Sequence, residues 1–228
     1  MPHRTLAELV EAVKREAARS EFPVDREVYE RLDRDPAEPI LCAGSLQAAY
    51  CVVGRDLGKD EVGARQPLIG AGGRLVREGF YRATHGGQNP PRSDRTLESV
   101  LDRVLLTNTV PFKPPGNKAY ATGVKERFRP FLAELLVALW QGDQVITLGN
   151  EAFWWFAPYA EDAQAFDAFW ERDDRYEASL SVTVRSGGAA DFATRRLTLL
   201  PLPHPSPLNQ RWYARFPGLL DGRLASKH

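Results

Sequence analysis

The sequence predicts an α/β fold, a three-layer α/β/α sandwich around a mainly parallel central sheet. Short apolar runs rich in valine, isoleucine and leucine alternate along the chain with segments of helical spacing. Three of these runs end in polar or glycine- and proline-rich loops, which is where such sheets bind ligands. The chain has 228 residues, 43% of them hydrophobic. We therefore expect a single domain over 1–228, with an N-terminal helical extension at about 1–38.

The individual elements follow from local pattern. Apolar residues at helical spacing predict an opening helix over 5–19. Three prolines within 111–116 exclude a helix or a ladder there. The other expected elements are a strand at 50–54, a loop at 86–93, helical spacing from Leu97 to Val104, a buried strand within 104–110, a helix at about 123–140, a strand at 144–149, a helix from about 150, extended chain over 176–199 with a turn at 186–188, and a strand at 197–201.

Composition gives no sign of a metal-cluster, secreted or membrane-spanning protein. Thirty basic and thirty acidic residues cancel, so the overall charge gives no argument for nucleic acid. Cys42 and Cys51 are too few for a four-cysteine site and form no CxxC pair, and they suit a reduced compartment. The charged start lacks the apolar run of a signal peptide, and no run approaches the ~20 residues of a membrane helix. We expect a cytoplasmic monomer that does not bind a membrane.

One local patch is basic. Between Arg92 and Arg129, eight lysines and arginines outnumber four acidic residues. The patch is either a surface for DNA or a solvated helix face of mixed charge. Its basic members are Arg92, Arg95, Arg103, Lys113, Lys118, Lys125, Arg127 and Arg129.

Three polar residues follow three of the predicted strands. Asp56 lies between two glycines, Asn108 ends a buried strand, and His204 lies in a proline-stiffened turn. Taken singly, each has an ordinary structural explanation: a turn residue, a cap and a rigid loop. Because the carboxyl ends of parallel strands share one edge of a sheet, we expect the three to lie at the same edge.

Four segments together resemble the uracil-DNA glycosylase superfamily, over roughly residues 48–220. The segments are VVGRDLGKDEVGARQPLIGAGGRLV (52–76), LLTNTVPFKPPGN (105–117), VITLGNEAFWWF (145–156) and HPSPLNQR (204–211). HPSPL after a strand is the most specific of them, and GxDxG alone is weak. The second segment is most similar to bacterial and archaeal branches that often carry an iron–sulfur cluster.

The resemblance implies a role for each polar residue. Asp56 matches the water-activating aspartate of the best-known branch. Asn108 matches the asparagine that reads the uracil edge, and His204 the histidine that faces uracil O2. Other matched positions line the base pocket or contact DNA. The pocket positions are Gly54, Arg55, Leu57 and Leu68, and the DNA positions are Ser206, Leu208 (which fills the gap left by the flipped base), Gly116, Asn117 and Arg211.

The sequence departs from those branches at three points. It lacks the four cluster cysteines, so we expect no cofactor and no metal. Leu68 stands where an aromatic residue stacks on the base, so either an aromatic substitutes for it or the pocket accepts bases differently; the possible substitutes are Phe80, Tyr81 and Phe112. Lys118–Tyr120 replaces the histidine of a branch that traps DNA covalently, which favours turnover. His85 is interpreted as a surface-loop histidine.

The predicted function is that of a monofunctional DNA N-glycosylase. It would flip uracil or a related deaminated base such as hypoxanthine out of DNA and hydrolyse the N-glycosidic bond. The alternative is a non-catalytic or differently specific relative that binds damaged DNA, which the joint presence of Asp56, Asn108 and His204 disfavours. An unrelated α/β hydrolase or nucleotide-binding enzyme would need a GxSxG, Walker or GxGxxG motif, and the sequence has none.

Overall fold

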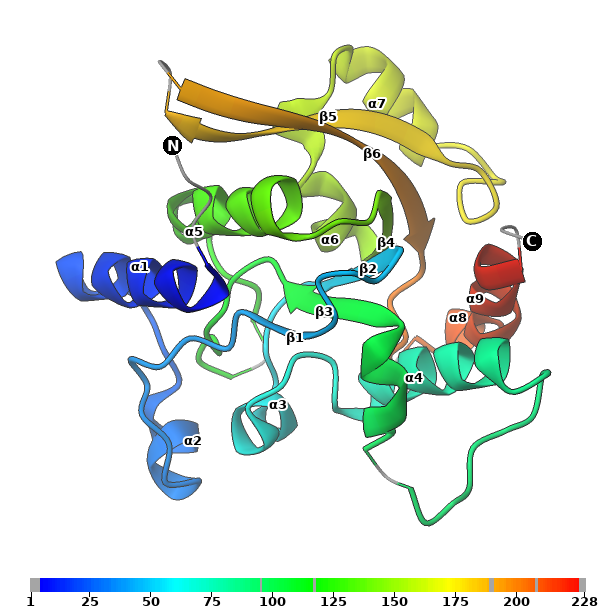
Figure 1. The fold of residues 1–228 in the computed structure, drawn as a ribbon, viewed down its shortest axis with the longest axis horizontal. Coiled ribbons are helices and arrows are strands. Elements are labelled where there is room, and N and C mark those ends of the chain that lie inside the picture. Colours follow the sequence, from blue (N-terminus) through cyan, green and yellow to red (C-terminus); the bar gives the residue numbers. More distant parts are fainter. Residues whose placement is uncertain (1–4, 95, 117, 189–190, 208, 226–228) are drawn as a thin grey trace.

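The computed structural model describes residues 5–94, 96–116, 118–188, 191–207 and 209–225. Its centre is a six-stranded sheet with the order β1-β3-β2-β4-β6-β5. Helices cover both faces of this sheet (Figure 1). The strands are β1 (Cys42–Gly44), β2 (Tyr50–Gly54), β3 (Val104–Asn108), β4 (Gln144–Leu148), β5 (Leu180–Gly188) and β6 (Asp191–Leu202).

The four inner strands are parallel, and the two edge strands, β1 and β5, are antiparallel to their neighbours. All five residues of β3 are buried. Parallel strands covered on both faces read as nearly continuous apolar runs, which is why these strands are visible in the sequence. The prediction of a three-layer α/β/α sandwich with a mainly parallel sheet is confirmed.

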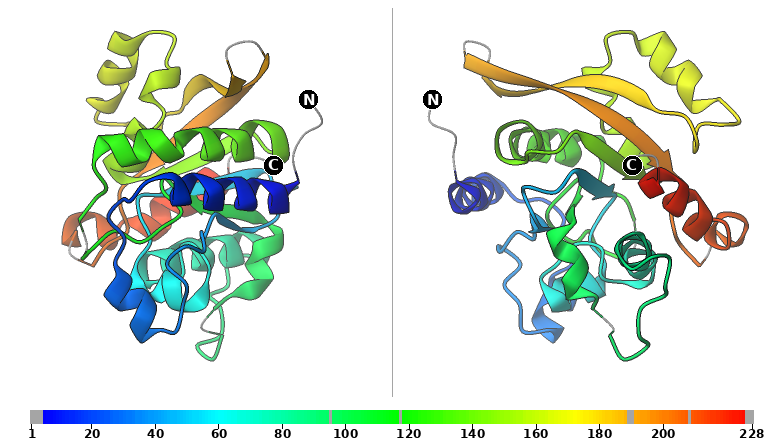
Figure 2. Two further views of the ribbon diagram at one scale, coloured as in Figure 1. Left: turned by 90° about the vertical axis from the view of Figure 1, so that its left-hand side faces the viewer. Right: turned by 45° about the vertical axis from the view of Figure 1, so that its right-hand side comes forward.

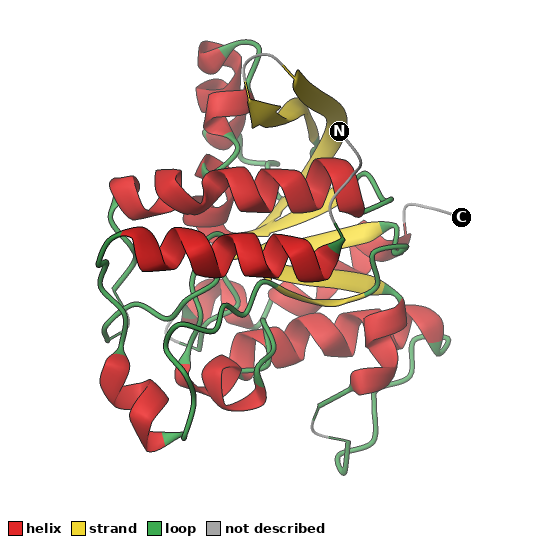
Figure 3. Cartoon of the chain, turned by 60° about the vertical axis from the view of Figure 1, so that its left-hand side comes forward, coloured by secondary structure: helices red, strands yellow, loops and turns green. Residues whose placement is uncertain are grey.

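Helices α1 and α5 lie side by side across one face of the sheet (Figure 3). Between them and the sheet lies the larger apolar core, which includes Leu9, Phe128 and Trp140. Helices α4 and α9 pack against each other on the opposite face. The helices and helical turns are α1 (Leu6–Arg19), α2 (Arg26–Arg31), α3 (Lys59–Ala64), α4 (Ala71–Thr84), η1 (Glu98–Asp102), α5 (Thr122–Glu134), η2 (Leu135–Leu139), α6 (Gly149–Trp154), η3 (Ala157–Tyr159), α7 (Ala163–Trp170), α8 (Gln210–Tyr213) and α9 (Phe216–Ala225).

The predicted opening helix is confirmed as α1, and its start is set by local chemistry. The Thr5 hydroxyl accepts a hydrogen bond from the Glu8 N–H, and the Glu8 carboxylate accepts from the Thr5 N–H. This reciprocal pair satisfies two backbone donors at the helix end. None of the described helices is long and apolar enough to cross a membrane.

The strand predicted within 104–110 is confirmed as β3, which begins at Val104; the helical spacing that overlaps it from Leu97 corresponds to the short turn η1, which ends at Asp102. One local prediction is wrong. The turn predicted at 186–188 belongs to β5, where Gly187 pairs with Phe192 and Gly188 with Asp191. Cross-strand pairing thus extends through the glycines. The resulting long strand β6 crosses the molecule toward α8 and α9 (Figure 2).

Candidate functional site

The carboxyl ends of the inner strands meet at one edge of the sheet. Gly54 at the end of β2 is in register with Asn108 at the end of β3, and Leu148 of β4 with Leu202 of β6. The polar loops that follow these strands therefore meet, as they do in open α/β sheets with a ligand site.

These loops surround a pocket of about 440 Å³. It contains the three polar residues predicted from the sequence, Asp56, Asn108 and His204. The remaining described lining residues are Gly54, Arg55, Leu57, Gly58, Glu61, Leu68, Gly70, Ala71, Gly72, Gly73, Pro114, Gly116, Leu148, Pro205, Ser206 and Pro207.

The Asp56 carboxylate is buried in this pocket, with 3% of its side chain exposed. The carboxylate forms an ion pair with Arg55, whose Nε lies 2.9 Å from Asp56 Oδ2. Beyond this ion pair, neither carboxylate oxygen has a hydrogen-bond partner among the described residues. Burial raises the pKa of Asp56, and the positive charges of Arg55 and Lys125 oppose that rise. Lys125 itself forms an ion pair with Glu151. Asp56 is thus a poorly solvated carboxylate whose charge two cations support.

The Asn108 side chain is buried, and its amide oxygen and nitrogen have no hydrogen-bond partner among the described residues. It packs directly over Gly54: a Cβ there would lie 2.3 Å from Asn108 Oδ1 and 3.0 Å from Leu68 Cδ2. Glycine is required at position 54 because the amide and the leucine occupy the space of a side chain. The three residues form one wall of the pocket.

Leu68 is held in an unusual backbone conformation, with φ of 53°, which is rare for a residue other than glycine. The buried Arg77 fixes it by donating from Nε to the Leu68 carbonyl (3.1 Å) and from Nη1 to the Thr96 carbonyl (2.8 Å). At Gly73, a Cβ would lie 2.0 Å from the Leu68 carbonyl oxygen. The surrounding structure therefore determines where this leucine points.

No phenylalanine, tyrosine or tryptophan is among the described residues that line the pocket. The three aromatic residues considered as substitutes for a stacking ring lie elsewhere. Phe80 and Phe112 are buried in the two cores, and Tyr81 stacks on His85 at 3.8 Å between ring centroids. The interpretation that one of them replaces the aromatic is wrong, since core packing already holds the two phenylalanines and His85 covers the tyrosine. His85 itself is exposed at the end of α4.

His204 lies in the loop after β6, where it lines the pocket while much of the residue remains accessible to solvent. The turn between β4 and α6 supports it: Gly149 has φ of +80°, and a Cβ there would lie 3.0 Å from the His204 Cβ. On the other side, a Cβ at Gly72 would lie 2.6 Å from the Pro205 carbonyl oxygen. Partial desolvation by the pocket walls lowers the pKa of His204, and the charge of Arg55 lowers it further. The imidazole is therefore neutral at neutral pH.

The other predicted positions divide into three groups. Leu57, Ser206 and Gly116 line the pocket. Arg211 does not: it is exposed on α8, with its guanidinium 5.0 Å from the Trp212 ring centroid. The predictions for Asn117 and Leu208 lie outside the described residues.

Glu61 has a positioning contact that the sequence reading did not identify. Its carboxylate accepts hydrogen bonds from the N–H of Gly58 (3.0 Å) and of Gly70 (3.1 Å). It thereby ties the loop that carries Asp56 to the start of α4. The signal in the sequence was a glutamate three residues after Gly58, the spacing of half a capping box.

Four of the seven described basic residues between Arg92 and Arg129 form ion pairs within the protein, Lys125 with Glu151 among them. The ammonium of Lys113 pairs with Asp25, and the guanidinium of Arg127 pairs with Glu16. Arg129 pairs with Glu126. Exposed basic residues remain at Arg92, Arg103 and Lys118, and Arg95 lies outside the described residues. The described part of the patch is therefore divided between ion pairs within the protein and exposed basic side chains.

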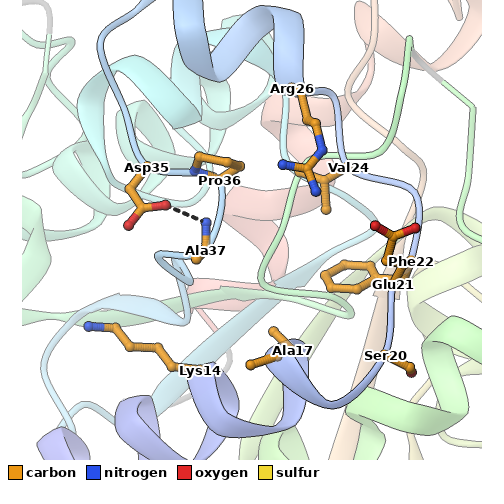
Figure 4. A pocket seen from close by; sticks show the side chains of 11 residues that line it. Lys14, Ala17, Ser20, Glu21, Phe22, Val24, Arg26, Asp35, Pro36 and Ala37 are labelled. Carbon is orange, nitrogen blue, oxygen red and sulfur yellow. Dashed lines mark hydrogen bonds between the residues drawn. The ribbon is translucent and has the colours of Figure 1, made fainter.

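A second pocket lies between α1 and segments 20–26 and 35–37 (Figure 4). Its wall carries charges of both signs. Lys14 is paired with Glu11 at 3.0 Å and Glu38 at 2.7 Å, and the Asp35 carboxylate accepts from the Ala37 N–H. None of the predicted site residues lines it.

Within the described ranges, no group of three or more histidine, cysteine or acidic side chains is arranged to hold a metal ion. A comparison with curated proteins found no match. The family model described as the uracil DNA glycosylase superfamily matches residues 43–224. This range covers most of the 228 residues and all the strands that position the pocket. The chain therefore belongs to the uracil-DNA glycosylase superfamily.

Proposed function

We propose that this protein flips uracil or a related deaminated base out of DNA and hydrolyses its N-glycosidic bond. One observation carries the proposal: the buried Asp56 carboxylate and the buried Asn108 amide line one pocket, and apart from the Arg55 ion pair their polar atoms have no hydrogen-bond partners among the described residues. Buried polar groups in native proteins are nearly always hydrogen-bonded. The donors and acceptors of Asp56 and Asn108 that lack partners among the described residues are therefore free to hydrogen-bond a polar ligand in the pocket.

The reaction develops positive charge on the sugar as the bond to the base lengthens. An ionised Asp56 stabilises that charge and orients the attacking water. Its poor solvation strengthens both effects, because charges interact more strongly where water is excluded. Arg55 and Lys125 oppose the rise in its pKa, so they favour the ionised form that the reaction needs.

The departing base carries the balancing negative charge. A neutral His204 donates one N–H to it, and Arg55, which lines the same pocket and whose charge reaches His204, adds a positive charge. Removal of one donor of this kind typically costs about 3 kcal/mol, or roughly 10²–10³ in rate.

Asn108 supplies selectivity through the polarity of its amide. The oxygen accepts from uracil N3–H and the nitrogen donates to O4, a pattern that cytosine reverses. Leu68 offers an apolar wall where relatives place an aromatic ring. Stacking on an aromatic ring is worth about 1–3 kcal/mol per base, so a leucine wall favours a broader range of deaminated bases, including hypoxanthine.

The experiment is an incubation of the protein with oligonucleotides that contain uracil, hypoxanthine, xanthine or a mismatch, with and without a chelator. We expect free base and abasic sites, with no loss of activity in chelator, because the proposed chemistry uses only side chains. Repeated turnover is expected, since Lys118–Tyr120 replaces the trapping histidine. Tight binding to the damaged DNA without abasic sites would instead indicate a damage-binding relative.

A further inference from the structure

The N-terminal segment precedes the range matched by the family model, yet it contacts the loop that follows Asn108. That loop, 111–116, contains Pro111, Pro114 and Pro115, which lack the N–H needed to join a ladder. It therefore needs partners from elsewhere in the fold. Two of its residues, Pro114 and Gly116, line the pocket.

Asp25 contributes three of those contacts. Its Oδ2 accepts from Lys113 Nζ at 2.7 Å and from the Gly116 N–H at 3.2 Å. Its own N–H donates to the Lys113 carbonyl at 3.0 Å. One residue thus holds the middle and the end of the loop.

Three further contacts come from the same segment. The Lys113 N–H donates to the Tyr29 hydroxyl at 3.1 Å, and the Ile40 N–H donates to the Pro111 carbonyl at 2.9 Å. Phe22 packs edge-on against Phe112, with 5.1 Å between ring centroids. The segment thus contacts the loop at Pro111, Phe112, Lys113 and Gly116.

Lys113 is internal, although it belongs to the basic patch. Only 4% of its side chain is exposed. Besides Asp25, its ammonium donates to the Pro114 carbonyl at 3.0 Å and the Gly116 carbonyl at 2.7 Å. All three ammonium donors are engaged, so this lysine organises the loop and does not face DNA.

We propose that Asp25 is a positioning residue of the base-excision site: through Lys113 and Gly116 it fixes loop 111–116 as a wall of the pocket. The proposal rests on the function proposed above. It makes the N-terminal segment a working part of the same domain.

The test compares Asp25→Asn with a matched control, Glu16→Gln. Asparagine caps helices as well as aspartate does, so Asp25→Asn keeps the start of α2, where the Asp25 side chain accepts from the Val28 N–H. It removes the charge that binds Lys113. Glu16 binds Arg127 at 3.0 Å and ties the N-terminal segment to α5 without touching the loop.

For Asp25→Asn we expect amide hydrogen exchange across 111–116 to accelerate about tenfold and kcat/KM on uracil-containing DNA to fall about tenfold. Glu16→Gln should leave both at the wild-type value. Lys113→Met should reproduce the Asp25→Asn effects, and the two changes together should add little. DNA binding by Lys113→Met should keep the wild-type salt dependence. Loss of a phosphate contact would instead lower the slope of log K against log salt concentration by about one.

Wild-type exchange in Asp25→Asn, or an equal loss of kcat/KM in Glu16→Gln, would overturn the proposal. Because exchange needs no substrate, it also separates the two proposals. A protein inactive on every substrate whose loop still exchanges faster in Asp25→Asn would count against the glycosylase activity and support the role of Asp25 in fixing the pocket wall.

Discussion

Asp25 and Asp56 are two aspartates near the same pocket with opposite surroundings. Asp25 accepts hydrogen bonds from Lys113 and from the Gly116 N–H, and the hydrogen bond from Lys113 lowers its pKa despite partial burial. Asp56 has an ion pair with Arg55 but no further hydrogen-bond partner among the described residues, and burial raises its pKa despite that pair.

The difference distinguishes a buried carboxylate that stabilises the fold from one that is kept for function. A buried charge with its hydrogen bonds satisfied stabilises the arrangement that satisfies it. A buried charge whose hydrogen bonds are incomplete opposes folding, and such groups are retained where function needs them. On the proposed function, the Asp25 contacts hold the pocket wall, while the Asp56 carboxylate keeps hydrogen-bonding capacity for the substrate.

Of the substitutions that test the contrast between the two aspartates, Asp56→Asn should have the largest effect. It should lower kcat on uracil-containing DNA by about 10³ or more, because the carboxylate acts on transition-state charge. Binding to the same DNA should stay close to wild type, since ground-state docking does not use that charge. Single-turnover rates and equilibrium binding measure the two effects, and an equally active variant would place the water-activating role on another residue.

Asn108→Asp tests the second unsatisfied group. The carboxylate keeps an acceptor for N3–H but loses the donor to uracil O4, so uracil excision should fall by roughly 10²–10³. Discrimination against cytosine should relax, because the acceptor also fits the cytosine amine. Rates on matched uracil and cytosine oligonucleotides give the ratio, and an unchanged ratio would contradict the base-reading role.

The pH profile should follow the raised pKa of Asp56. Since the ionised form is active, kcat/KM should fall about tenfold per pH unit on the acid side, with a midpoint above that of an ordinary aspartate. Arg55→Gln should move this midpoint upward, because Arg55 opposes the rise in the pKa of Asp56. Arg55→Lys keeps the positive charge and serves as the control. A midpoint that does not move would assign the acid limb to another group.

The smallest expected effect is a pair of opposite stability changes at pH 7. The lowered pKa of Asp25 contributes stability that is present above its unfolded-state pKa and lost as pH falls through the folded-state pKa. The raised pKa of Asp56 works the other way: its contribution is present at low pH and lost as pH rises through the folded-state pKa. Asp25→Asn should lower Tm and Asp56→Asn should raise it.

Each shift should be about 2–4 °C, the change that about 1 kcal/mol produces in a domain of this size. Both differences should shrink as pH falls and the two carboxylates become protonated. Thermal unfolding at several pH values measures them. Shifts of the same sign at pH 7 would contradict the contrast between the two aspartates.

Local pattern predicted much of the fold. The buried run within 104–110 and the valines of 50–54 read as strands because parallel strands are apolar on both faces. Pattern failed where two signals overlapped. At Val104, helical spacing and a β-branched run coincide. Because Val104 pairs with Tyr50 of β2, it belongs to the strand β3. At 186–188 the glycines suggested a turn, but pairing with β6 continued through them.

The sequence by itself determined the alternation of strands and helices and the ends of the strands after which Asp56, Asn108 and His204 lie. These features depend on residues close together in the chain. Only the tertiary structure decided that Lys113 turns inward to Asp25, that Arg77 fixes Leu68, and that no described aromatic side chain faces the base pocket. Those outcomes join residues as far as 88 positions apart. Whether a buried lysine or asparagine finds a hydrogen-bond partner depends on the packing of distant segments, which local spacing does not encode.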